Sequence, residues 1–218
     1  MKHEQIKKLC VMSMLCAVAY VVMLAIKVPV ILFLKYEPKD VIITFGGFLY
    51  GPVAALIISA VVSFIEMLTV SDTGWIGFVM NVVSTAAFAC TAALIYRKKH
   101  TLLGAVLGLL CGIVAMAAVM IAWNYLLTPL YMGTPRADVA EMLLPVFLPF
   151  NLLKGILNSA IILLLYRPMV QGLRSAKLFP RSSSDRKPGL LSKILLWSLS
   201  LLVMAACILV ILHYNNII

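Results

Sequence analysis

Long apolar runs separated by short polar stretches dominate this chain. The runs are continuous rather than alternating in hydrophobicity, which is typical of transmembrane helices and not of membrane-barrel strands. Backbone polar groups in lipid must bond within the protein, and helices satisfy this requirement. The sequence therefore predicts an all-α, polytopic membrane protein, with spans at about 9–34, 41–50, 53–70, 75–96, 102–126, 149–166 and 190–212.

Two segments depart from a simple series of spans. The run 41–50 is followed by Gly51-Pro52, and a helix of that length reaches only about 15 Å, roughly half of the hydrocarbon core. We expect it to be tilted or partial and to pack through Gly46 and Gly47. The stretch 127–148 is expected to be the largest loop on the outer side.

The composition agrees with a membrane protein. The chain has 218 residues, of which 63% are hydrophobic and 12% are charged, and its mean hydropathy is +1.07. Soluble domains average roughly 45–50% apolar and about 25% charged residues. The net charge of +10 does not indicate a nucleic-acid partner, because the basic residues gather beside the ends of apolar runs. Their distribution predicts a multi-pass protein of the cell membrane that is surrounded by lipid and has its amino terminus in the cytoplasm.

Lys154 is the most informative single residue. It interrupts an otherwise apolar run, where a lysine near the middle of a membrane helix costs roughly 2.5–3.5 kcal/mol. Asn151, Lys154 and Asn158 are spaced i, i+3, i+7 and share one helix face. This polar stripe indicates a polar partner, cavity or ligand inside the bundle.

Other polar residues are expected at a similar depth in the outer half of the bundle. Together they predict a pocket that opens to the outside. The alternative is that such residues only join helices, and that Lys154 only forms an ion pair with Glu66 or Asp40. The candidate ligand-binding residues are Asn151, Lys154, Asn124, Asp40, Thr44, Tyr36, Glu66, Asn81 and Asn158.

The sequence carries no recognisable catalytic or metal-binding motif. There is no HExxH, GxSxG or P-loop, the cysteines form no CxxC pair, and the three histidines are far apart. We therefore expect no enzyme activity, no metal and no cofactor. An autonomous permease or channel stays open as an alternative, as does a membrane enzyme that uses Glu66 and Asp40 as acid or base.

The first helix carries a further pattern. Ser13 and Ala17 place small residues on one face, and such faces permit close contact between helices. The contact is either internal or made with another protein.

Three stretches carry a resemblance to a known family. They are Leu34-Lys35-Tyr36-Glu37-Pro38-Lys39-Asp40 with Gly51-Pro52, Asn124-Tyr125 through Thr128-Pro129-Leu130-Tyr131, and Leu148-Pro149-Phe150-Asn151-Leu152-Leu153-Lys154-Gly155. Over about residues 9–168, the chain resembles the substrate-binding S components of energy-coupling factor (ECF) vitamin transporters, most closely the riboflavin-specific type.

The resemblance implies a six-helix fold that binds vitamin from the outside. The implied partners are riboflavin or a related flavin, a transmembrane coupling subunit and two cytoplasmic ATPases. It further implies that Asn124, Asn151 and Lys154 contact the flavin, that 40–44 lines or covers the site, and that Ser13 and Ala17 meet the coupling subunit. An S component for a different vitamin is the main alternative within the family.

The chain departs from the family pattern after the sixth helix. We predict a six-helix core at 1–168, a basic cytoplasmic linker at 169–189 and an additional transmembrane helix at 190–218. The sequence leaves the role of this last helix open.

Overall fold

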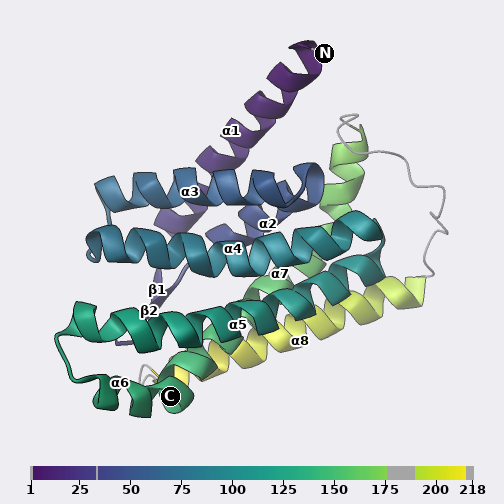
Figure 1. The fold of residues 1–218 in the computed structure, drawn as a ribbon. Helices are drawn as coiled ribbons and strands as arrows, with labels where there is room; N and C mark the ends of the chain where they lie inside the picture. Colours follow the sequence, from purple (N-terminus) through teal and green to yellow (C-terminus); the bar gives the residue numbers. More distant parts are fainter. Residues whose placement is uncertain (1, 33, 176–189, 215–218) are drawn as a thin grey trace.

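The computed structural model describes residues 2–32, 34–175 and 190–214, and it shows a bundle of long helices (Figure 1). Among these residues, five helices are long and apolar enough to cross a membrane, and Trp197–Leu212 is a shorter apolar helix. The all-α membrane fold is thus confirmed. The helices are α1 Lys2–Ala25, α2 Lys39–Tyr50, α3 Pro52–Thr69, α4 Gly74–Lys98, α5 Leu102–Met132, α6 Arg136–Met142, α7 Leu148–Ser175 and α8 Leu190–Tyr214.

The predicted first span, 9–34, is wrong at its outer end. Helix α1 ends at Ala25, and the chain then forms an antiparallel hairpin from β1 Val28–Ile31 and β2 Leu34–Tyr36. Pro29 explains the change, because proline has no N–H to donate and disfavours helical geometry in the residue before it. The hairpin, whose second strand ends at Tyr36, lies at one end of the bundle.

The predicted outer loop, 127–148, is also wrong. Helix α5 continues through Pro129 to Met132 and ends at Gly133, which has a positive φ of 66°. After α6, the five residues Leu143–Phe147 form a π-helical turn that leads directly into α7. The outer end of the bundle is therefore helical rather than a long irregular loop.

The short helix α2 packs closely against its neighbours at its glycines, as predicted. A Cβ built on Gly47 would lie 3.0 Å from Ala93 Cβ and 3.1 Å from Ala55 Cβ, so this position favours a residue without a side chain. Gly51 has a φ of 89°, a conformation that glycine adopts without strain, and Pro52 begins α3. Helix α2 is thereby held between α3 and α4.

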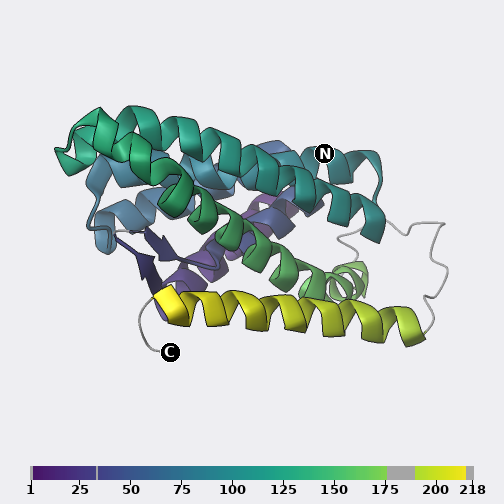
Figure 2. The same cartoon turned by 90° about the horizontal axis from the view of Figure 1, so that it is seen from below.

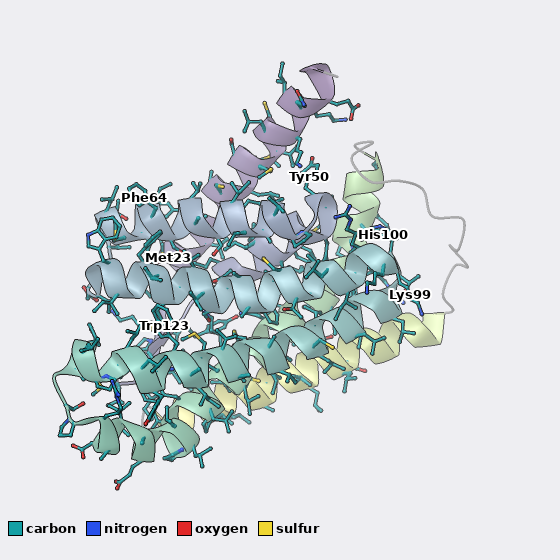
Figure 3. All side chains as sticks on the ribbon, in the orientation of Figure 1. Met23, Tyr50, Phe64, Lys99, His100 and Trp123 are labelled. Atoms are coloured by element: carbon teal, nitrogen blue, oxygen red, sulfur yellow. The ribbon has the colours of Figure 1, made fainter. Side chains whose placement is uncertain are left out.

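The two ends of the bundle differ in character. The hairpin and α6 lie at one end, whereas Lys99 and His100, at the turn between α4 and α5, lie at the other (Figure 3). Helix α8 packs against α7 and reaches the hairpin with its carboxyl-terminal end (Figure 2). The hairpin end is where the predicted pocket should be found.

Candidate ligand-binding site

A cavity of about 250 Å³ lies at the hairpin end of the bundle. It is lined by the hairpin region, the turn between α3 and α4, and helices α3, α4, α5 and α7. Both polar and apolar side chains line it, as is common for small-molecule sites. The lining residues are Lys27, Leu34, Lys35, Glu37, Glu66, Ser71, Asp72, Thr73, Met80, Asn81, Ser84, Met120, Tyr131, Phe150, Asn151 and Lys154.

Lys154 lines this cavity and is only 6% exposed. Its ammonium lies 3.0 Å from Oδ2 of Asp40, a residue of the first turn of α2 that is completely buried. Asp40 also accepts hydrogen bonds from Thr85 Oγ1 at 2.7 Å and from Asn158 Nδ2 at 3.4 Å. The cost of burying Lys154 is therefore offset by a carboxylate whose own position is fixed by α4 and α7.

Tyr36 connects the hairpin to this arrangement. Its hydroxyl donates a hydrogen bond of 2.9 Å to Asn158 Oδ1, while the amide nitrogen of Asn158 donates to Asp40. A continuous chain of polar contacts thus runs from Tyr36 through Asn158 and Asp40 to Lys154. It ties β2, α2 and α7 together behind the cavity wall.

A second charged cluster surrounds Glu66. The Lys39 ammonium contacts the Glu66 carboxylate and lies 2.6 Å from Glu37, although Lys39 is completely buried. Lys27 lies 3.2 Å from Glu37 and 3.7 Å from Glu66, and Asn81 donates to Glu66 at 3.2 Å. Two carboxylates and two ammonium groups are balanced here, against the edge of the cavity.

The electrostatics of Glu37 follow from this cluster. Burial raises the pKa of its carboxyl group, but the ammonium groups of Lys39 and Lys27 outweigh burial, and the pKa lies below its usual range. Sequence reasoning missed Lys27, Glu37 and Lys39 as site residues. The available signal was the charged run Glu37-Pro38-Lys39 directly before an apolar helix.

The structure divides the nine predicted ligand-binding residues into two groups. Asn151, Lys154, Glu66 and Asn81 line the cavity. The other five do not line it: Tyr36, Asp40 and Asn158 form the chain behind the wall, whereas Thr44 and Asn124 bond locally. Thr44 donates to the Asp40 carbonyl, and Asn124 donates to the Met120 carbonyl and accepts from Thr128.

One ion pair joins the two sides of the cavity mouth. Lys35, in β2, lies 2.6 Å from Asp72, in the turn between α3 and α4. The hydrogen bond and charge of Lys35 lower the pKa of the Asp72 carboxyl group. Both residues line the cavity; Asp72 is exposed to solvent and Lys35 is partly exposed.

The apolar part of the lining comes mainly from three helices. Phe150 of α7, Met80 of α4, and Met120 and Tyr131 of α5 face the cavity. Trp123 and Tyr125 do not line it, because Trp123 packs against the core and Tyr125 lies beneath Arg136, whose guanidinium is 5.7 Å from the ring. A planar apolar ligand group would therefore meet Phe150 rather than Trp123.

Comparison with known proteins shows which family the chain belongs to. A family model described as "ECF transporter, substrate-specific component" matches residues 7–166. The chain belongs to this family. The resemblance seen in the sequence is thereby confirmed, and the protein is a multi-pass membrane protein of the transporter class.

Named relatives are similar over most of their length. The chain is 33% identical to "Riboflavin transporter RibU" of Staphylococcus aureus over 181 residues, which cover 78% of this chain and 94% of that protein. It is 28% identical to "Riboflavin transporter FmnP" of Bacillus subtilis over 186 residues, covering 79% and 98%.

A solved structure shows the same fold. The structure described as the S component of a bacterial ECF transporter has a TM-score of 0.67 and 31% sequence identity, and covers 78% of this chain and 99% of that chain. The family match ends at residue 166, so α8 lies beyond it.

Proposed function

We propose that this chain is the riboflavin-binding S component of an ECF-type importer. It captures the vitamin at the outer face of the cell membrane, and an ATPase module drives its delivery inward. The observation that carries the proposal is the cavity at the hairpin end, lined by Lys154, in a chain similar to two riboflavin transporters. Transport rather than catalysis is its role.

The chemistry of the lining suits a flavin. Phe150, Met80 and Met120 offer apolar and aromatic surface for the flat ring system. Asn81, Asn151 and Lys154 offer amide and ammonium groups to ring carbonyls and ribityl hydroxyls. Polar groups left without partners would disfavour ligands that lack matching atoms.

Charge balance favours an uncharged vitamin over a charged one. The lining contains three lysines, Lys27, Lys35 and Lys154, and three carboxylates, Glu37, Glu66 and Asp72. Each ammonium group lies within ion-pair distance of a carboxylate. A ligand with a net charge would leave an uncompensated charge in a partly buried site, which is costly. Riboflavin is neutral at physiological pH.

The proposed orientation puts the amino terminus in the cytoplasm. The basic turn between α4 and α5 lies opposite the hairpin, so the cavity then faces outward. The proposed six-helix core is 1–168, with 190–218 as an additional helix. Helix α7 extends to Ser175, and the rest of the proposed linker 169–189 lies outside the described residues.

The proposed partners are the transmembrane coupling subunit and two cytoplasmic ATPases. Ser13 and Ala17 on α1 are exposed, so the small-residue face is free to meet another protein. Helix α1 packs on α2 and α3, whereas α8 packs on α7 and β1 (Figure 1). The additional helix therefore leaves this face uncovered.

Purified protein tests the ligand directly. We expect it to retain a yellow, flavin-like absorbance through washing and to quench riboflavin fluorescence on titration. Thiamine and biotin, which are charged at neutral pH, should not displace the flavin. A colourless protein that does not quench riboflavin fluorescence would overturn the proposed function.

Enlarging the small-residue face of α1 tests the partner contact. Ala17→Leu is expected to lower riboflavin uptake by about tenfold in cells that supply the coupling subunit and ATPases, because close helix contact is lost. Flavin binding by the purified variant should be unchanged. Val114→Leu, at an exposed position of α5, is the matched control and should transport normally. Full uptake by Ala17→Leu would exclude this face from the contact.

A further inference from the structure

Helix α8 lies directly behind the wall of the ligand cavity. Its carboxyl-terminal end reaches the hairpin, and the helix packs against α7 (Figure 2). Its buried residues Ser200 and Cys207 are spaced i, i+7, and Ile211 follows four residues later, so they form one inward stripe. Leu202 and Leu209 on other faces are largely exposed. The helix thus has a defined contact face rather than a uniformly lipid-facing surface.

The inward stripe belongs to the same apolar cluster as the cavity wall. Cys207 and Ile211 pack in a cluster with Val30, Leu34 and Tyr36 of the hairpin and with Phe147 and Phe150. Two members of this cluster, Leu34 and Phe150, line the cavity itself. Helix α8 therefore shares an apolar cluster with two side chains of the cavity wall.

Tyr36 links this cluster to Lys154. Its ring packs in the cluster with Cys207 and Ile211, while its hydroxyl bonds Asn158, which in turn bonds Asp40. Asp40 holds the Lys154 ammonium. Any shift of the Tyr36 ring would therefore be transmitted to the ligand-facing cation through three polar contacts.

The packing between α8 and the hairpin leaves some free space. A small apolar cavity of about 80 Å³ lies between the hairpin, the start of α7 and α8, lined by residues that include Val30, Phe150 and Val210. Without the stripe from α8, the hairpin would have more room to move away from α7. The contact is thus placed where it limits hairpin movement.

We propose that α8 is a positioning element of the binding site, whose buried face holds the hairpin and Tyr36 in place and so slows ligand release. This inference rests on the proposed function, because the released ligand is the flavin. Since α8 lies beyond the family match, the device is an addition to the family core.

The test uses the full chain with substitutions on the two faces of α8. Ile211→Ala is expected to speed riboflavin dissociation by about three- to tenfold, measured by stopped-flow recovery of fluorescence, with little change in the association rate. Ile211→Val, which keeps most of the side chain, should restore slow release. Leu209→Ala, at an exposed position of the same helix, is the matched control. If Ile211→Ala does not fold, Cys207→Ala makes the same test.

A double-mutant cycle separates positioning from general destabilisation. If α8 acts through Tyr36, the effects of Ile211→Ala and Tyr36→Phe on the dissociation rate should not add, whereas independent effects would add. Unchanged release by the α8 variants, or strict additivity with Tyr36→Phe, would overturn this inference alone. A wild-type protein that bound no riboflavin would overturn the proposed function as well, so the two failures are distinguishable.

Discussion

Lys154→Ala is expected to weaken riboflavin binding by about 10- to 150-fold, the loss that follows when a charge-assisted hydrogen bond of about 1.5–3 kcal/mol is removed. The substitution takes a donor from the cavity wall and leaves the buried Asp40 carboxylate without its ion-pair partner. Titration of the purified variants by flavin fluorescence quenching measures the effect.

Two further variants separate binding from folding. Ser59→Ala removes a buried hydroxyl that does not line the cavity, and it should bind nearly as tightly as the wild type. Lys154→Met combined with Asp40→Asn removes both charges, so the protein should regain stability without regaining affinity. Equal affinities for Lys154→Ala and Ser59→Ala would remove Lys154 from the binding site.

The polar face of α7 shows what could be predicted from sequence. The i, i+3, i+7 spacing placed Asn151, Lys154 and Asn158 on the interior side of one helix, and all three are buried. Periodicity does not tell which buried polar side chain faces a cavity and which one is hydrogen-bonded to a neighbouring residue. Asn158 is bonded to Tyr36 and Asp40, which are 122 and 118 residues away, so its position behind the wall depends on tertiary structure.

The hairpin shows what the hydrophobic pattern could not resolve. A short apolar run is equally compatible with the end of a helix and with a buried strand, so the pattern alone does not separate the hairpin from the predicted span 9–34. Pro29 was the local signal that favoured a strand or turn. The ion pairs of Lys39 were likewise hidden, because Glu66 lies 27 residues away on a separate helix.

Lys39→Met is expected to destabilise the protein by about 3–5 kcal/mol at pH 7, the usual cost of removing one partner from a buried ion pair. Lys39 is completely buried between Glu37 and Glu66, and its removal would leave the two carboxylates with Lys27, which is partly exposed and lies farther from Glu66. Thermal unfolding of the purified variant, compared with that of the wild type, measures the loss. Lys35→Met is the matched control, because the pair between Lys35 and Asp72 is exposed and should contribute little.

The stability that Lys39→Met loses should be greater at pH 7 than at low pH. Because Lys39 lowers the pKa of Glu37, the stability that this pair contributes is present above the unfolded pKa of glutamate, about 4.3, and disappears as the pH falls through the folded pKa. In Lys39→Met the Glu37 carboxylate loses that stabilisation and takes up a proton at higher pH than in the wild type, which relieves its repulsion of Glu66. The difference in melting temperature between wild type and variant should therefore be large at pH 7 and shrink as the pH falls to about 4. A difference that stayed constant over this range would mean that packing of the lysine side chain, rather than its charge, is what stabilises the fold.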